Sequence, residues 1–172
     1  MLITPEYRAQ QQELHRNAQY GVASLQYAPF VLSVIERYGA RDVLDYGAGK
    51  GRLGEALFTS GFRGNYHPYD PAIPYWSDEP EPAEMVACID VLEHIEPDLL
   101  DNVLDNLQAL TRRVGVLTVH TGPAKKTLPD GRNAHLTQQP LPWWQKKIGS
   151  RFVLKQAEQS GSGAVFVVEP LP

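Results

Sequence analysis

The sequence predicts an α/β fold built as one domain. A glycine-rich turn follows a short apolar run at residues 43–46, further strand-like runs alternate with segments of helical spacing, and two short runs joined by a Gly-Ser turn end the chain. Alternating strands and helices are typical of α/β domains. A chain of 172 residues is long enough to bury one continuous core.

The N-terminal segment predicts two helices. Residues 5–20 form a polar helix for which Thr4 is the expected N-cap, and Tyr20-Gly21 interrupts it. A second helix is expected over about residues 29–38, because its apolar residues recur at helical spacing and Gly39 follows it.

Residues 43–54 carry the strongest local pattern. A buried strand ending near Asp45 is followed by glycines at 47, 49 and 51 and then by a helix that runs to about residue 60. Glycines allow positive φ and let a ligand lie against the backbone. Free amides at the helix start can bind an anionic group. The alternative is a turn with no ligand.

A second strand is expected from Asn65 to Tyr69, and Asp70-Pro71 ends it. A dinucleotide fits this arrangement, because Gly49, Gly51 and Gly54 satisfy G-x-G-x-x-G and Asp70 stands at the ribose-binding distance. S-adenosylmethionine fits too, with its ammonium near Asp45 and its ribose near Asp70. Alternatively, Asp70 only begins a turn with Pro71.

The remaining elements follow in order. Prolines at 71, 74, 80 and 82 leave little room for regular structure over residues 71–84. We expect strands at 85–89 and 114–119, a helix at 98–110 capped by Asp98, a long loop at 122–142, a helix around Trp143, Trp144 and Ile148, and a hairpin of residues 152–156 and 164–169.

Two segments resemble the class I S-adenosylmethionine-dependent methyltransferases. Asp45-x-Gly47-x-Gly49-x-Gly51 resembles motif I of that family, and Asp90-Val91-Leu92-Glu93-His94-Ile95 resembles the stretch that borders the cofactor's sulfonium and the substrate. Because a nicotinamide-binding fold offers no reason for the second segment, we prefer S-adenosylmethionine to a dinucleotide. The resemblance extends from about residue 20 to the C-terminus.

The resemblance implies a three-layer Rossmann-like methyltransferase sheet, mostly parallel with an antiparallel C-terminal hairpin. The sheet is expected to be shortened between the second and fourth strands, where residues 71–84 replace a helix and a strand. Residues 1–172 are expected to be a single methyltransferase domain, in which 1–40 form an N-terminal helical lid and 41–172 the core. The implied cofactor-binding residues are Asp45, Gly47, Ala48, Gly49, Gly51, Asp70, Asp90 and Leu92.

Asp90, Glu93 and His94 lie at i, i+3 and i+4, so a helix would bring them to one face. Two carboxylates and an imidazole can bind a divalent metal, with His135 or His120 as a further ligand. The arrangement Asp90, Glu93, His94 and His135 resembles that of the small-RNA 3′-terminal 2′-O-methyltransferases. Without a metal, a histidine is the expected general base, and His94, His120 and His135 are the catalytic candidates.

The charge is unevenly distributed. The net charge is −4, but residues 1–110 carry −10 and residues 111–155 carry +8. A positive region attracts anionic ligands, although it can also be a solvated face without a partner. With Lys125, Lys126 and Arg132, and with Trp143 and Trp144 available for stacking, we expect methyl transfer to oxygen or nitrogen of a small anionic acceptor: a nucleotide, a sugar-linked metabolite or an RNA end.

The alternative function is binding of S-adenosylmethionine without turnover, in a regulatory or diverged protein, and the shortened 71–84 region favours it. No apolar run approaches the ~20 residues that cross a membrane, and the N-terminus lacks the apolar core of a signal peptide. We therefore expect a cytoplasmic protein without a membrane partner. Cys88 is expected to be a buried apolar residue, and His15 and His67 to be surface or packing residues.

Overall fold

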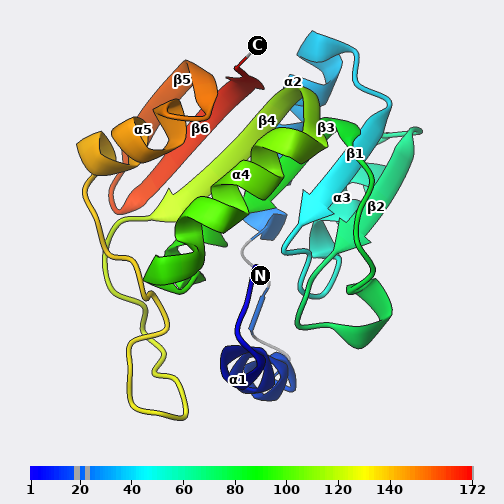
Figure 1. The fold of residues 1–172 in the computed structure, drawn as a ribbon. Coiled ribbons are helices and arrows are strands. Elements are labelled where there is room, and N and C mark those ends of the chain that lie inside the picture. Colours follow the sequence, from blue (N-terminus) through cyan, green and yellow to red (C-terminus); the bar gives the residue numbers. More distant parts are fainter. Residues whose placement is uncertain (18–19, 22–23, 172) are drawn as a thin grey trace.

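A six-stranded sheet forms the centre of the structure (Figure 1). The computed structural model describes residues 1–17, 20–21 and 24–171. The strand order is β2-β1-β3-β4-β6-β5; β1 to β4 pair in parallel, whereas β6 is antiparallel to β4 and β5. The strands are β1 (Asp42–Tyr46), β2 (Asn65–Tyr69), β3 (Ala83–Ile89), β4 (Thr111–His120), β5 (Phe152–Ser160) and β6 (Gly163–Pro170). The predicted mostly parallel sheet with an antiparallel hairpin is confirmed.

Helices cover both faces of the sheet. In Figure 1, α4 (Leu100–Leu110) and α5 (Leu141–Gly149) lie in front of it, and α2 (Ser24–Tyr38) and α3 (Arg52–Thr59) lie behind. Successive residues of a strand point to opposite faces. Met85, Ala87 and Ile89 of β3 accordingly join the core beneath α2 and α3, whereas Val86 and Cys88 join the core beneath α4 and α5. Three layers and a buried Cys88 are thus as predicted.

The connection between β2 and β3 is short. In the described part of this connection the only helical element is the 3-10 turn η1 (Pro74–Trp76), which Trp76 N closes by donating to Ile73 O at 2.9 Å. Asp70 N donates to Trp76 O at 2.9 Å and so joins this turn to the end of β2. Its prolines exclude a longer helix, because they lack the N–H that helical hydrogen bonds need. The expected shortening of the sheet is confirmed.

Both N-terminal helices differ from their predicted bounds. The first, α1 (Pro5–His15), begins as expected, with Thr4 Oγ1 accepting from Tyr7 N at 3.2 Å, but it ends well before residue 20. Residues 18–19, which were expected to continue it, lie outside the described residues. The helix α2 begins at Ser24 and contains Pro29. Burial of one side of α2 against α3 and the sheet outweighs the single hydrogen bond that a proline removes.

Two further boundaries correct the prediction. Asp98 does not cap a helix: it lies in the 3-10 turn η3 (Pro97–Leu99), and Leu99 holds the N-cap position of α4 without a side-chain hydrogen bond. Strand β4 starts at Thr111, which is also the C-cap of α4, so the chain passes from helix to strand without a loop. Strand β5 extends to Ser160 through an irregularity in its pairing with β6.

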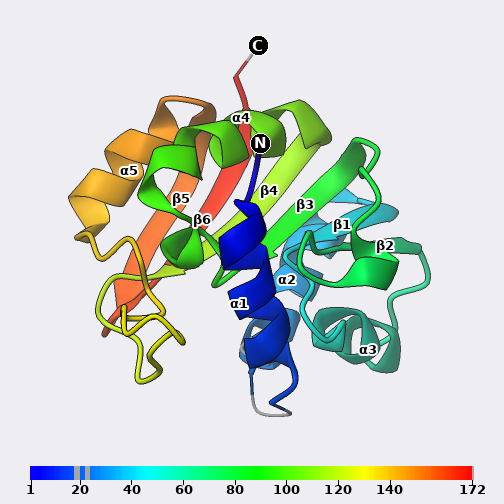
Figure 2. The same cartoon turned by 60° about the horizontal axis from the view of Figure 1, so that its bottom comes forward.

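The helix α1 lies outside these layers, beyond the carboxyl ends of the parallel strands (Figures 1 and 2). Thr4 N and Oγ1 donate to Glu96 at 2.9 and 2.7 Å, and Tyr7 packs with Leu128 and Ala134 of the loop after β4. In open α/β sheets, ligands bind outside the carboxyl ends of the strands. The helix α1 therefore covers the end of the sheet where a ligand is expected.

Candidate active site

The glycine-rich turn after β1 has the predicted backbone conformation. Gly47 and Gly49 have φ of +81° and +53°, in the region that other residues rarely adopt. A Cβ on Gly47 would lie 2.4 Å from Val91 Cγ2, so a side chain has no room there. The amides of Gly47 and Ala48 donate to Tyr69 O at 2.8 and 3.0 Å, which fixes the turn against the end of β2.

Asp45 and Asp70 stand at the ends of β1 and β2. Asp70 is buried and accepts from the amides of Gly49 and Ala72, both at 2.9 Å, so it orders the glycine turn and the start of the next loop. Asp45 accepts a hydrogen bond from the Tyr66 hydroxyl. Burial raises the pKa of Asp45 to about 7, although the Tyr66 hydrogen bond opposes this shift.

The segment after β3 turns sharply and does not continue as an α-helix. Asp90 has φ of +53°, an unusual conformation for a non-glycine residue, and its Oδ1 accepts from Thr118 Oγ1 at 2.6 Å. Burial raises the pKa of Asp90. The 3-10 turn η2 (Leu92–His94) follows. The expected helical face of Asp90, Glu93 and His94 therefore does not form, and the metal-ligating geometry found at Glu93 and His94 does not include Asp90.

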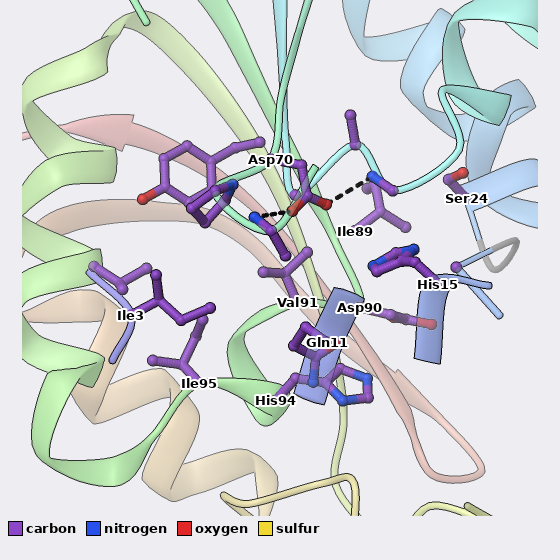
Figure 3. Close-up of a pocket in the computed structure, with 18 of the residues that line it drawn as sticks. Ile3, Gln11, His15, Ser24, Asp70, Ile89, Asp90, Val91, His94 and Ile95 are labelled. Atoms are coloured by element: carbon purple, nitrogen blue, oxygen red, sulfur yellow. Dashed lines mark hydrogen bonds between the residues drawn. The ribbon is translucent and has the colours of Figure 1, made fainter. Parts of the chain in front are cut away.

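These segments surround one cavity at the carboxyl end of the sheet (Figure 3). Most of the predicted site residues line it: Asp45, Gly47, Ala48, Gly49, Asp70, Asp90, His94, His120 and His135. Gly51, Leu92 and Glu93 are not among the lining residues. Gly51 lies against the Trp76 ring, Leu92 belongs to the core beneath α4, and Glu93 is fully buried.

Three histidines from separate segments meet at this cavity. The ring centroids of His94 and His135 are 4.8 Å apart, and those of His120 and His135 are 4.9 Å apart. Nδ1 of His94 lies 2.8 Å from Ala134 O, and Nδ1 of His135 lies 2.7 Å from Gly122 O. A carbonyl only accepts, so both Nδ1 atoms carry the proton and both Nε2 atoms have a free lone pair when the rings are neutral.

The environments of the three rings differ. Burial lowers the pKa of His94 to about 4, and the neighbouring His135 contributes to this shift. Burial also lowers the pKa of His135, which is half-buried. His120 Nε2 lies 2.6 Å from Ser162 Oγ at the tip of the β5–β6 hairpin. Of the three, His120 is thus the one whose Nε2 is already engaged by a side chain.

Glu93 lies directly beneath this cluster. Its Oε1 accepts from His120 N at 2.7 Å, whereas its Oε2 is buried without a hydrogen-bond partner in the described structure. Burial raises the pKa of Glu93 well above its usual range, and Asp90 adds to the shift. Glu93, His94 and His135 each offer one ligand atom, and these atoms lie within 4.8 Å of one another. A divalent cation would satisfy the unpartnered carboxylate oxygen.

Residues 1–40 were expected to form a lid, but no side chain of α1 was predicted at the cavity. Tyr7, Gln11 and His15 line the cavity, together with Tyr20. Gln11 Nε2 donates to Tyr7 Oη at 2.7 Å, Tyr7 Oη donates to His94 O at 2.6 Å, and Tyr20 Oη donates to Gln11 Oε1 at 2.8 Å. The signal was present, because positions 7, 11 and 15 recur at i and i+4 and so share one helix face. His15, expected on the surface or in packing, is a cavity residue.

The basic segment 111–155 is largely neutralised by acids brought close in the fold. Arg113 pairs with Glu84, Arg132 with Asp130, Lys147 with Asp101, Arg151 with Asp101 and Asp105, and Lys155 with Glu169. Lys126 remains near the cavity, with Nζ 4.8 Å from the centroid of the Tyr20 ring.

The two tryptophans of α5 lie away from the cavity. Trp144 is fully buried in the core beneath α4 and α5, and Trp143 packs against it. Neither is among the lining residues, so the expected stacking on an acceptor has no support in this fold.

No helix within the described ranges combines the length and the apolar character that spanning a membrane requires.

Comparisons with known proteins identify the family and the fold of the chain. The profile of a methyltransferase-domain family matches residues 9–155. No curated protein matches the chain. Among solved structures, 1,6-didemethyltoxoflavin-N1-methyltransferase from Burkholderia thailandensis, with bound 1,6-didemethyltoxoflavin and S-adenosylhomocysteine, is 17% identical; the match has a TM-score of 0.69 and covers 100% of this chain and 92% of that chain.

Two other matches show the same fold. Magnesium protoporphyrin IX methyltransferase (ChlM) from Synechocystis PCC 6803, with bound S-adenosylhomocysteine, is 16% identical at a TM-score of 0.60, covering 97% of this chain and 95% of that chain. The methyltransferase domain of a bacterial protein named CtHen1 is 14% identical at a TM-score of 0.58, and the match covers 84% of this chain and 99% of that chain. With the family profile over most of its length and this fold, the chain belongs to the methyltransferase-domain family and is a class I S-adenosylmethionine-dependent methyltransferase.

Proposed function

We propose that the enzyme transfers a methyl group to an oxygen or nitrogen of a small anionic acceptor that binds beside His94, His120 and His135. The observation that carries this proposal is the histidine cluster at the cavity, in which Nε2 of His94 and of His135 has no hydrogen-bond partner among the described residues. Transfer to oxygen or nitrogen requires removal of one proton, and a neutral imidazole is suited to that task.

The cofactor site that we propose lies at the other side of the cavity. We propose that Asp45 binds the ammonium of S-adenosylmethionine and that Asp70 binds the ribose hydroxyls, since both line the cavity. The turn of Gly47, Ala48 and Gly49 lets the cofactor lie against the backbone, and Asp90 borders it. We assign no direct contact to Gly51 or Leu92, since both side-chain positions face other parts of the protein. The helix α1 acts as the lid, whereas α2 packs on the sheet.

Methyl transfer is a displacement at the sulfonium carbon, so the enzyme must align the acceptor, exclude water and accept its proton. We propose His135 as the group that accepts it. Its Nε2 has no hydrogen-bond partner within the described part of the chain, its Nδ1–H is held by Gly122 O, and its half-buried ring lines the cavity. His94 is the weaker base because burial lowers its pKa to about 4. His120 is engaged with Ser162 and borders the acceptor.

The same residues fit a divalent metal. Glu93 Oε2 is buried without a partner, and His94 and His135 each have Nδ1–H held by a backbone carbonyl, the usual arrangement behind a metal-bound imidazole. As the alternative to proton transfer by His135, we propose Glu93, His94 and His135 as its ligands, because a metal on Nε2 of His135 would occupy the lone pair that otherwise accepts the proton. Asp90 does not belong to this set. A metal held by these residues would supply Lewis acidity, which would favour loss of the proton from the acceptor.

The residues that close the cavity, and the lysines beside them, indicate the size and charge of the acceptor. Tyr7, Gln11 and Tyr20 close the site from the α1 side, which favours a small molecule, or the end of a larger one such as RNA, over a broad surface. Lys126 lies over Tyr20 at the same side, and Lys125 precedes it. These two lysines support negative charge on the acceptor, because most of the other basic residues of the segment are paired.

The test is methyl transfer from labelled S-adenosylmethionine to a panel of phosphorylated and unphosphorylated hydroxyl and amine acceptors. We expect transfer to a phosphorylated acceptor, abolished by His135→Ala and by His94→Ala while binding of S-adenosylhomocysteine is retained. His67→Ala, at an exposed histidine of β2, is the matched control. Transfer at the wild-type rate in both active-site variants would contradict the role of the histidines.

The proposed metal site is tested by measuring the metal content of the purified enzyme before and after chelation. Stoichiometric metal that is lost in Glu93→Gln supports the metal site. An enzyme that is equally active after complete chelation and without bound metal assigns the proton transfer to His135 alone.

A further inference from the structure

The cavity has an unbalanced set of charges for the ligand that it is proposed to bind. Asp45, Asp70 and Asp90 line it, whereas no lysine or arginine of the described chain does. S-adenosylmethionine carries a sulfonium and an ammonium, which three carboxylates suit. Its methionyl group also carries a carboxylate, and that carboxylate needs a hydrogen-bond donor in the same cavity. Among the residues that line the cavity, the donor is therefore a group other than a lysine or arginine side chain.

His15 lies where such a donor is needed. Its ring packs on the glycine turn: a Cβ on Gly49 would be 3.4 Å from His15 Cε1, and one on Gly21 would be 3.1 Å from the same atom. Figure 3 shows the ring between the glycine turn, Asp90 and Ser24. Nδ1 of His15 is buried and has no hydrogen-bond partner in the described structure. A buried ring nitrogen without a partner is unfavourable unless a ligand meets it.

The position of His15 is fixed by contacts on both sides. Lys50 Nζ donates to His15 O at 2.7 Å, which ties the end of α1 to the glycine turn. The Tyr20 ring stands edge-on to the imidazole, with centroids 5.0 Å apart. The imidazole is therefore held in the cavity before a ligand binds.

Other donors at the cavity are less suited. Tyr20 Oη donates to Gln11, and the Nδ1 atoms of His94 and His135 face backbone carbonyls. Tyr20 also separates His15 from His94, since its centroid lies 6.3 Å from that of His94. Ser24, the first residue of α2, is another candidate among the described residues at this end of the cavity.

We propose that His15 is a cofactor-binding residue whose Nδ1 donates to the methionyl carboxylate of S-adenosylmethionine, so that α1 reads the amino-acid end of the cofactor. The proposal rests on the proposed cofactor site. It makes α1 part of the cofactor site as well as its cover, and it makes recognition of the carboxylate depend on a histidine.

The experiment compares two ligands that differ in this group. S-adenosylhomocysteine carries the carboxylate, whereas 5′-methylthioadenosine keeps the adenosine and sulfur but lacks the amino-acid end. Calorimetry measures both dissociation constants for the wild type, His15→Phe, His15→Asn and the matched control His67→Phe. Phenylalanine keeps an aromatic ring against Gly21, Gly49 and Tyr20 but removes both nitrogens, whereas asparagine offers an N–H close to the position of Nδ1.

We expect His15→Phe to weaken binding of S-adenosylhomocysteine about 10- to 100-fold, the scale of one charge-assisted hydrogen bond, and to change binding of 5′-methylthioadenosine less than about 2-fold. His15→Asn should recover part of the loss, and His67→Phe should change neither constant. If His15→Phe fails to fold, His15→Asn provides the same test. The ratio of the dissociation constant of S-adenosylhomocysteine to that of 5′-methylthioadenosine should then be higher in His15→Asn than in wild type, but by less than the factor expected for His15→Phe.

Unchanged binding of S-adenosylhomocysteine in His15→Phe overturns the proposal and leaves the carboxylate to another donor, such as Ser24. Equal weakening of both ligands also overturns it, because His15 then contacts the adenosine half or only packs. A wild type that binds neither ligand overturns the proposed cofactor site itself. That result is distinct from the first two, in which the wild type binds both.

Discussion

At the scale of single residues, the site depends on acids held at the ends of strands. Asp70 accepts from two backbone amides and lines the cavity, so it both orders the glycine turn and presents a carboxylate to a ligand. Asp45 is buried deeper and is bonded to Tyr66. The two carboxylates thus have different environments and should respond differently to substitution.

Asp70→Ala should weaken binding of S-adenosylhomocysteine by about 1–3 kcal/mol, the cost of losing a hydrogen bond to a charged group. Calorimetry at fixed pH measures the change, with Asp78→Ala, an exposed acid in the loop after β2, as the control. Unchanged affinity in Asp70→Ala would exclude Asp70 as the ribose ligand.

Asp45 should make stability depend on pH. Its pKa is about 7 in the folded protein and about 3.9 in an unfolded chain, so between these values the folded state holds a proton that the unfolded state has lost. The free energy of unfolding therefore falls as pH rises from about 4 to about 7, by at most about 1.4 kcal/mol per pH unit from this group.

Asp45→Asn cannot ionise but can still accept from Tyr66. The stability of Asp45→Asn relative to wild type should increase from pH 5 to pH 8, as measured by urea unfolding at each pH. Asp78→Asn should show no such trend. If the free energies of unfolding of Asp45→Asn and wild type differed by the same amount at pH 5 and pH 8, the pKa of Asp45 would lie near its usual range.

At the scale of elements, α1 is the piece that completes the site. It is polar and packs through few apolar side chains, and Glu96 holds its start through Thr4. Its face of Tyr7, Gln11 and His15 reaches both the glycine turn and His94. Loosening one end of α1 should therefore affect the cover of the cavity without unfolding the sheet.

Glu96→Ala removes both acceptors of Thr4, so amide hydrogen exchange over residues 5–15 should become faster while exchange in α4 stays as in wild type. Asp98→Ala, at an exposed acid close in sequence to Glu96, is the control. Saturating S-adenosylhomocysteine should restore protection in Glu96→Ala if α1 closes on the cofactor. Unchanged exchange would mean that Glu96 does not hold the helix.

At the scale of the whole molecule, stability comes from two cores on the faces of the sheet. Trp144 is among the largest fully buried side chains, and it joins α5 to the core that contains α4 and the hairpin. Trp143, its neighbour in sequence, is half-buried and lies beneath Lys147. The two positions should therefore differ in their effect on folding.

Trp144→Ala should lower the free energy of unfolding by about 3–5 kcal/mol, the usual cost of removing a large aromatic side chain from a core. Trp143→Ala should cost less, because part of that side chain already meets water. Urea unfolding measures both. Equal losses would show that Trp143 contributes to the core as much as Trp144 does.

The local patterns of the sequence predicted much of the fold. Alternating apolar runs gave the strand positions, glycines at every second position gave the turn after β1, and prolines after Asp70 gave the shortened connection. Helix ends were less well predicted at α1 and α2, where burial against other elements, and not propensity, decides the boundary. The shared helix face that was predicted for Asp90, Glu93 and His94 does not form, because the chain turns with positive φ at Asp90.

By itself, the sequence determined the order of the elements, the glycine turn, the acids at the strand ends and the Glu93-His94 segment, because each depends on residues that are neighbours along the chain. Only the tertiary structure decided that His135 contacts both His94 and His120, that His15 reaches the glycine turn, that Trp144 is core, and that most of the basic segment is paired. These contacts join distant positions through the path of loops and the packing of α1, which no local periodicity encodes.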